Sequence, residues 1–503
     1  MMFKCAQVFS DNMVLQRGRP VAVFGQGEDG VVVTAEIGDN RAVCTVKDGR
    51  WLCRLKPMAA AEGLELKVTH GAESVVFRDV AVGEVWFLGG QSNMELELQN
   101  AKDGAKYLSE LNEGVPVRYY YTPKVATFEE AEREGARSCW GKAGSESSKA
   151  WSAVGFHFGM KLAKELGVVV GLIGCNWGGT SASCWVDRAT LEADKRISSY
   201  IEEYDAKIAG KSLEEQKAEY EQYFEENEEW NRKSAEILKE EPGLDWGELE
   251  KRLGKNKWPG PLNEYNPFRP TNMFENMVMR VCPYTIKGFL YYQGESDDHK
   301  PDSYYRLFTA LIDRWRTAWG DDTLPFIMVQ LPMFKYAADP DYKHWCKIRS
   351  AQMKAYRTVK NTGIAVILDC GEFNEIHPKD KLPVGERLCL QAEKVAYGMD
   401  VDGDAPMFAG AVFEDGRAVV TVSLKNGGLV VKGEIPENAF ELAGEDGEYR
   451  PAKAEIEGST IVVTSAEVAQ PKAVRYCRVN YGEVAVFGKN GIPLAPFSTS
   501  EDV

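Results

Sequence analysis

A serine follows two glycines at the end of an apolar run in EVWFLGGQSNM, residues 84–94. The run VWFL is rich in strand formers, and Gly89 and Gly90 permit a tight turn that a Cβ would obstruct. In an open parallel sheet, ligands bind beyond the carboxyl ends of the strands. Ser92 is therefore either a nucleophile presented at a strand end or a cap of the helix that follows.

A serine nucleophile needs a base, and the chain has five histidines: His70, His157, His299, His344 and His377. His377 follows the apolar run IAVILDC, and Pro378 delays any helix after it. Its loop is thus expected beyond the carboxyl end of a strand, as Ser92 is. His377 is the candidate base, although a loop histidine taken alone is more often not catalytic.

Two more apolar runs end in groups that stabilise negative charge. CNWGGTSASCW places Gly178 and Gly179 after VVVGLIG, where their backbone amides could face an oxyanion. YYQGESD places Gln293 and Glu295 after IKGFLYY, as an amide donor and a carboxylate. Each string alone is compatible with a turn. Four strand ends that supply nucleophile, amides, side-chain donor and base form the constellation that acyl transfer requires.

These residues need a sheet to position them. From residue 83 to residue 400, apolar runs such as FIMVQLP alternate with helical segments such as DSYYRLFTALIDRWRTAW. That alternation predicts an α/β domain with a doubly wound parallel sheet, covered by helices on both faces. A highly charged stretch at about 191–254 interrupts the rhythm and indicates an inserted helical hairpin, either solvated or acting as a lid or partner-binding element.

Short alternating runs flank this region. They include VVVTAEI and LELKV within residues 1–82, and RAVVTVSL and TIVVTS within residues 401–503, and they predict an antiparallel β module at each end. GQGEDG matches the pattern GxGxxG, but a dinucleotide fingerprint opens a helix and a strand-like run follows here, so a hairpin turn is predicted. DVDGD, residues 400–404, lacks the later ligands of a calcium loop and is interpreted as a linker.

Composition excludes several classes of protein. With 60 Lys and Arg against 76 Asp and Glu, the formal charge of −16 argues against a nucleic-acid partner, while a local basic pocket for a small anion stays compatible. No run approaches the roughly 18 apolar residues of a membrane span, so no membrane partner is expected. We also expect no metal or other cofactor, because HExxH and zinc-ligand spacings are absent.

The 11 cysteines show no CxxC pair, and an odd number cannot all pair within one chain. Reduced thiols and a cytoplasmic location are therefore expected. The sequence MMFKCAQVFSDNMVLQ shows no export signal, although a trimmed signal would imply an extracellular protein. The sequence does not indicate an oligomeric state.

The strings GGQSNM, WGGT, YYQGESD and IHP resemble, in that order, the motifs of SGNH-type hydrolases in the sialate O-acetylesterase group of carbohydrate esterases. FSDNMVLQRGRPVAVFGQG and VRYCRVNYGEVAVFGKNGIPLAPF are similar to the opening and the ending of that group. The resemblance covers nearly the whole chain and is weakest in the charged insertion. It implies an SGNH-type hydrolase domain between two β modules.

The resemblance also implies roles for single residues. Ser92 would be the nucleophile and His377 the general base. The oxyanion hole would consist of the Ser92 amide, an amide of Gly178 or Gly179, and the side chain of Gln293.

One position departs from the pattern, because Asn374 stands where many SGNH enzymes carry an aspartate. A neutral amide cannot stabilise an imidazolium as a carboxylate does. Either a Ser-His dyad operates, or another carboxylate serves. Glu295 is the first candidate acid, unless it has a structural role, and Glu375 and Glu372 follow.

The implied function is release of acetate from O-acetylated sugars, preferentially O-acetylated sialic acid, by a serine acyl-enzyme mechanism. An esterase for acetylxylan or another plant glycan is the alternative within this chemistry, and a non-catalytic glycan-binding protein is the alternative outside it. Trp177 and Trp185 are candidates for stacking on a sugar or for packing. Arg349 is a candidate for binding a substrate carboxylate.

Overall fold

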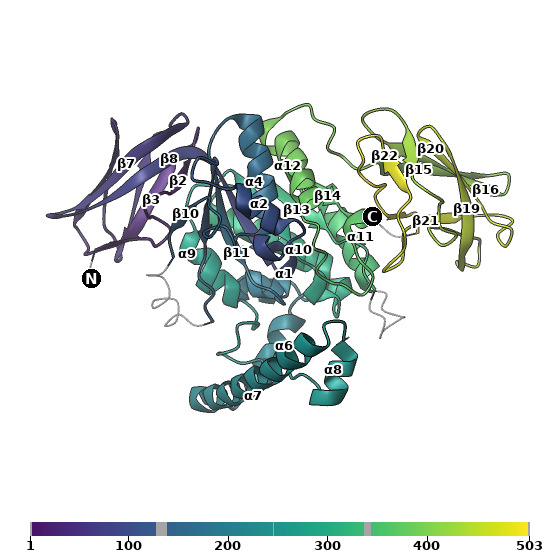
Figure 1. Ribbon diagram of the computed structural model, residues 1–503, viewed down its shortest axis with the longest axis horizontal. Coiled ribbons are helices and arrows are strands. Elements are labelled where there is room, and N and C mark those ends of the chain that lie inside the picture. The colour runs from purple at the N-terminus through teal and green to yellow at the C-terminus, as the bar shows by residue number, and fades with distance from the viewer. Residues whose placement is uncertain (1–2, 127–137, 245, 336–343, 501–503) are drawn as a thin grey trace.

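The computed structural model describes residues 3–126, 138–244, 246–335 and 344–500. A central body of strands and helices lies between β strands of the N-terminal region on one side and β strands of the C-terminal region on the other (Figure 1). The predicted mixture of sheets and helices is confirmed. None of the described helices is long and apolar enough to cross a membrane.

The central strands pair in the order β10-β9-β11-β8-β12-β13-β14. All neighbours in this order are parallel except β9 and β10. Their bounds are β8 Glu73–Gly90, β9 Val117–Tyr121, β10 Trp140–Lys142, β11 Val170–Asn176, β12 Gly288–Tyr292, β13 Phe326–Gln330 and β14 Thr362–Val366. Strands β11 to β14 are buried along their whole length, which explains their continuous apolar sequence.

Helices pack on both faces of this sheet. Neighbouring residues of a strand point to opposite faces. A Cβ built at Gly155 of α4 would lie 2.3 Å from Leu88, whereas one built at Gly89 would lie 2.4 Å from Trp315 of α10. The helices α4 Ala153–Leu166 and α12 Leu382–Tyr397 pack together, as do α10 Pro301–Trp319 and α11 His344–Thr358.

Three central strands end at the same level. Gly90, the last residue of β8, pairs with Asn176 of β11 and with Tyr292 of β12. Gly90 has φ +135°, and a Cβ there would lie 2.1 Å from the Tyr292 carbonyl oxygen, so only glycine fits. The short helix α1, Ser92–Glu95, starts directly beyond this edge.

The N-terminal strands belong to two sheets. They are β1 Lys4–Cys5, β2 Val14–Gln16, β3 Val21–Gln26, β4 Val32–Ile37, β5 Asn40–Thr45, β6 Arg50–Leu55 and β7 Ala61–His70. Strands β2, β4, β5 and β7 join the sheet that contains β8, whereas β1, β3 and β6 form a separate three-stranded sheet. β8 pairs with β2 up to Gly83 and with β11 from Glu84 onward. The predicted limit between residues 82 and 83 thus falls inside one strand, where its partners change. Strand β4 follows the GxGxxG match, in place of a helix.

The charged stretch forms a helical lobe that projects from the central body (Figure 1). Its helices are α6 Ser199–Ile208, α7 Leu213–Glu240 and α8 Trp246–Leu253. Ser212 and Glu215 form a capping box at the start of α7, which satisfies two of the free amides there. The lobe thus contains a long, capped helix whose residues are mostly in contact with solvent.

The C-terminal strands form an antiparallel sheet in the order β15-β16-β20-β19-β18-β21-β23, and β17 pairs with β22. Their bounds are β15 Met407–Glu414, β16 Arg417–Ser423, β17 Leu429–Val431, β18 Phe440–Ala443, β19 Tyr449–Glu457, β20 Thr460–Thr464, β21 Ala473–Tyr476, β22 Val486–Gly488 and β23 Phe497–Ser498. The remaining short helices are η1 Leu98–Asn100, α2 Gly104–Glu110, η3 Ala182–Trp185, α5 Arg188–Ala193, η4 Phe274–Val278, α9 Met279–Val281, η5 Glu295–Asp297 and η6 Leu368–Cys370.

Candidate active site

Ser92 and His377 meet beyond the carboxyl ends of the central strands. Ser92 opens α1 directly after β8, and His377 lies in the loop between η6 and α12. The Nε2 atom of His377 lies 2.8 Å from the Oγ atom of Ser92. This is the contact through which an imidazole removes a proton from a serine hydroxyl.

The protonation state of His377 suits that role. Burial lowers the pKa of His377 below its ordinary value of 6.5, and the nearby charge of Lys381 lowers it further. The carboxylates of Glu375 and Glu95 act in the opposite direction. The net effect leaves the imidazole neutral at neutral pH. When its single ring proton is on Nδ1, Nε2 can accept the serine proton.

The predicted acid of a triad is only partly present. Glu375 Oε1 accepts a hydrogen bond of 2.8 Å from the backbone amide of His377 and lies 3.9 Å from Nδ1, which is too long for a hydrogen bond. Asn374 adopts φ +60° and its backbone amide donates to the carbonyl of Lys335. Within the described part of the chain, neither Asn374 nor Glu295 hydrogen-bonds to the His377 ring.

Glu295 has the structural role in place of the acid role. Its Oε1 atom accepts a 2.7 Å bond from Asn93, which also donates to the Ile376 carbonyl at 2.9 Å and accepts from Lys381 Nζ at 2.6 Å. Asn93 follows Ser92 and Ile376 precedes His377, so this buried network fixes both catalytic candidates. Burial raises the pKa of Glu295 and lowers that of Lys381 to about 8.

Sequence reasoning missed Asn93 and Lys381. Asn93 lies within GGQSNM, so its position in the motif was the available signal. Lys381 carries no comparable signal, because its contact with Asn93 spans 288 residues and depends on how α12 packs.

The two glycine amides differ. The Gly178 amide donates a 2.6 Å hydrogen bond to Glu95 Oε2 and is therefore occupied, in contrast to its predicted role in an oxyanion hole. Gly179 has φ +78°, and its amide has no acceptor among the residues that the structure describes. The Ser92 amide lies in the first turn of α1, where no intrahelical acceptor exists. These two amides are the available donors beside Ser92.

Gln293 does not point its amide at an oxyanion. Its Nε2 atom donates to the Thr180 carbonyl at 3.1 Å and to Asp297 Oδ2 at 2.6 Å, which uses both hydrogens. Its Oε1 atom accepts from the hydroxyls of Tyr291 and Tyr304. The prediction of a side-chain oxyanion donor at Gln293 is thus wrong for this structure, because the buried amide is fully satisfied by its neighbours.

Comparison with known proteins shows which proteins this chain resembles. Residues 260–381 match the family model of the carbohydrate esterases described as sialic acid-specific acetylesterase. The mouse sialate O-acetylesterase is 27% identical over 431 residues, which cover 79% of this chain and 74% of that protein. The human sialate O-acetylesterase is 26% identical over 430 residues, which cover 79% and 71%.

A crystal structure of a carbohydrate acetylesterase from Xanthomonas citri superposes on 99% of both chains with a TM-score of 0.77 and 28% identity. The chain is an esterase that resembles the carbohydrate esterases. The family match of this esterase contains Gln293, Glu295 and His377, whereas Ser92 precedes it.

Burial excludes two of the candidate contacts with substrate and leaves the packing alternative for Trp185. Trp185 of the esterase is fully buried and donates to Thr180 Oγ1 at 2.9 Å, so it packs rather than stacks on a sugar. Arg349 is 1% exposed and donates to the carbonyls of Pro332 and Val479, which makes it inaccessible to a substrate carboxylate.

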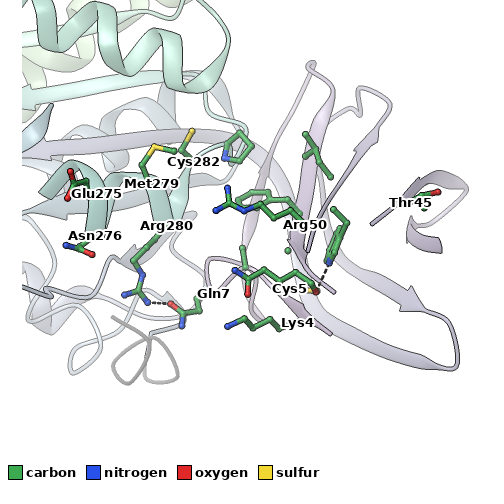
Figure 2. A pocket seen from close by; sticks show the side chains of 17 residues that line it. Lys4, Cys5, Gln7, Thr45, Arg50, Glu275, Asn276, Met279, Arg280 and Cys282 are labelled. Atoms are coloured by element: carbon green, nitrogen blue, oxygen red, sulfur yellow. Dashed lines mark hydrogen bonds between the residues drawn. The ribbon is translucent and has the colours of Figure 1, made fainter. Parts of the chain in front are cut away.

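A cavity of about 640 Å³ lies apart from this site, between the N-terminal strands and the segment around α9 (Figure 2). Arg50, Met279 and Arg280 are among its lining residues, and none of the residues around Ser92 contributes to it.

Among the described residues of the esterase, no cluster of His, Cys, Asp and Glu could hold a metal ion.

Proposed function

We propose that the esterase releases acetate from O-acetylated sugars through an acetyl-Ser92 intermediate, in an SGNH-type domain, with O-acetylated sialic acid as its preferred substrate. The 2.8 Å contact between His377 Nε2 and Ser92 Oγ carries this proposal. The family description and the mouse and human relatives support the choice of sugar.

In the first half of the reaction, His377 removes the Ser92 hydroxyl proton while Oγ attacks the acetyl carbonyl carbon. The carbonyl oxygen becomes negatively charged. The amides of Ser92 and Gly179 stabilise it, since neither is held by another acceptor among the described residues. His377 then gives its proton to the sugar oxygen, the carbon–oxygen bond breaks, and the sugar leaves.

In the second half, His377 removes a proton from water, and the resulting hydroxide attacks the acetyl carbon of acetyl-Ser92. His377 returns the proton to Oγ as the bond between Oγ and the acetyl carbon breaks, and acetate leaves. Glu375 is the carboxylate nearest to Nδ1 in the described part of the site. We assign it the stabilisation of the imidazolium through charge, while the network of Asn93, Glu295 and Lys381 fixes the geometry.

An acetate-release panel tests this proposal. It compares mono-O-acetylated sialic acids with acetylated xylo-oligosaccharides, using the wild type, Ser92→Ala, His377→Ala and the exposed control Ser147→Ala. We expect faster release from the sialic acids, and a loss of about 10³-fold or more in kcat in the two site variants only. Unchanged release by Ser92→Ala would contradict the mechanism, and faster release from the xylo-oligosaccharides would favour the plant-glycan alternative.

A further inference from the structure

Trp258, in the segment between α8 and the rest of the central body, is 52% exposed. Its indole nonetheless has a fixed place. A Cβ built at Gly179 would lie 2.5 Å from Trp258 Cζ2, and one built at the neighbouring Gly178 would lie 3.2 Å from the Cβ of Ser92. Trp258 therefore contacts Gly179, next to the glycine that borders the nucleophile, and about half of its surface is exposed to solvent.

Two further aromatic rings continue from Trp258. Phe268 makes edge-to-face contacts with Trp258 at 5.4 Å and with Trp177 at 6.4 Å between ring centroids. The ammonium group of Lys124 lies 5.6 Å from the centre of the Trp177 ring. The three rings form an aromatic wall along the Gly178–Gly179 turn, with a cation at the far end.

The helical lobe holds this wall in place. Gln216 of α7 accepts a bond from Asn263 through its backbone carbonyl and one from the Glu264 amide through its side chain. Tyr223 of α7 packs on Gly260, where a Cβ would lie 2.4 Å from the ring. Asn266 is fully buried and donates to the carbonyls of Pro259 and Pro261, on either side of that glycine.

We propose that Trp258 forms a sugar-binding subsite, in which its exposed face stacks on a pyranose ring of the acetylated glycan beside acetyl-Ser92. The C–H groups on one face of a pyranose are weakly positive and match the negative face of an indole. A large exposed aromatic beside a reaction centre is also typical of a ligand contact. This inference rests on the proposed function and gives the charged insertion a role in substrate recognition.

The test compares Trp258→Ala with Trp258→Tyr and with Phe224→Ala. Phe224 lies on α7 in the same lobe, is also 52% exposed and contacts no other ring among the described residues, so it is a matched control. We expect Trp258→Ala to raise KM for acetylated sialic acid and acetylated xylotriose about three- to tenfold. Trp258→Tyr keeps an aromatic face and retains most of the affinity, and Phe224→Ala changes nothing.

Hydrolysis of 4-nitrophenyl acetate, which has no pyranose ring, distinguishes a loss of sugar binding from a disturbance of the Gly179 turn. We expect Trp258→Ala to leave it within about twofold of the wild type. An equal loss on 4-nitrophenyl acetate and on the sugars would overturn the subsite and indicate that Trp258 only supports the Gly179 turn.

Calorimetric titration of N-acetylneuraminic acid and of xylotriose into Ser92→Ala, with and without Trp258→Ala, tests the subsite independently of the mechanism. Weaker binding of at least one of these sugars in the double variant supports the subsite, and unchanged affinity for both contradicts it. A failure of the serine mechanism would appear instead as acetate release by Ser92→Ala.

Discussion

His377 has a pKa below 6.5 because its ring is partly buried and Lys381 lies nearby. The neutral imidazole is the active base, so kcat/KM should be constant at neutral pH and fall as pH drops through the lowered pKa, below pH 6.5. Lys381→Met removes a charge that disfavours the imidazolium. We expect it to raise the pKa of His377 and to move this acid limb to higher pH.

The pH dependence of kcat/KM for an aryl acetate measures this shift. Lys379→Met is the matched control, since Lys379 is exposed two residues away and its charge is screened by solvent. An acid limb that stays in place in Lys381→Met, or that moves equally in Lys379→Met, would be inconsistent with this account.

Glu375 is the second residue to test. Its side chain is 44% exposed and its carboxylate lies 3.9 Å from Nδ1 of His377. A partly exposed ion pair of this kind contributes about 0.2–1 kcal/mol, so Glu375→Gln should lower kcat/KM by a factor of about 1.4 to 5. Glu372→Gln, in the same loop, serves as the control. A loss above about 100-fold in Glu375→Gln would instead indicate a full catalytic triad.

At the residue scale, the sequence placed Ser92 and His377 correctly beyond strand ends, because each follows an apolar run that forms a buried parallel strand. It could not show that Glu95 occupies the Gly178 amide. Such a contact depends on side-chain conformations in a turn, and spacing along the chain does not determine them.

At the scale of elements, Gln293 links the end of β12 to η5 and to the turn at Thr180. Gln293→Met keeps the shape but removes the hydrogen bonds that the side chain makes to Asp297 and the Thr180 carbonyl and accepts from two tyrosine hydroxyls. We expect it to destabilise the fold by about 1–3 kcal/mol and to keep kcat within about tenfold at 25 °C. Thermal unfolding and steady-state kinetics measure the two effects, with the exposed Gln99→Met as the control.

Loss of activity without loss of stability in Gln293→Met would instead support the predicted role of Gln293 as an oxyanion donor. Loss of an oxyanion donor lowers kcat about 10²- to 10³-fold without an effect on stability. A large loss of kcat with an unchanged melting temperature would therefore contradict the hydrogen-bond network described above.

The charged insertion shows what element-scale prediction can and cannot do. Its length and charge pattern predicted helices, and α6, α7 and α8 form there. The place of Trp258, which follows the insertion, could not be predicted, because it lies 79 residues from Gly179 in the sequence and no quoted family motif lies next to it. Tertiary packing alone brings this aromatic to the catalytic turn.

At the scale of the whole molecule, Arg349 ties α11 to the C-terminal strands. Its guanidinium donates to the carbonyls of Cys477, Val479 and Asn480, just after β21. Arg349→Met leaves the carbonyls of Cys477 and Val479 without the guanidinium donor and should destabilise the protein by about 3 kcal/mol or more. Denaturant unfolding measures this loss, and faster proteolysis near residue 478 would locate it.

Arg357→Met is the control for this prediction, since Arg357 is exposed on the same helix. Equal stability of Arg349→Met and Arg357→Met would contradict a role of Arg349 in holding the C-terminal strands.

The division of the chain into three parts stays a prediction at this scale. Alternating apolar patterns distinguished the flanking β strands from the central region. They could not show that β8 runs through the predicted limit at residues 82 and 83, because a single long strand can exchange partners without any break in its sequence pattern.

Trapping the covalent intermediate tests the central claim most directly. Wild-type enzyme is mixed with an acetylated sialic acid, quenched with acid within one turnover, digested, and mapped by mass spectrometry. We predict one acetyl group on the peptide that contains Ser92, and none in Ser92→Ala or His377→Ala. Continued acetate release with no acetyl group on Ser92 would contradict the account.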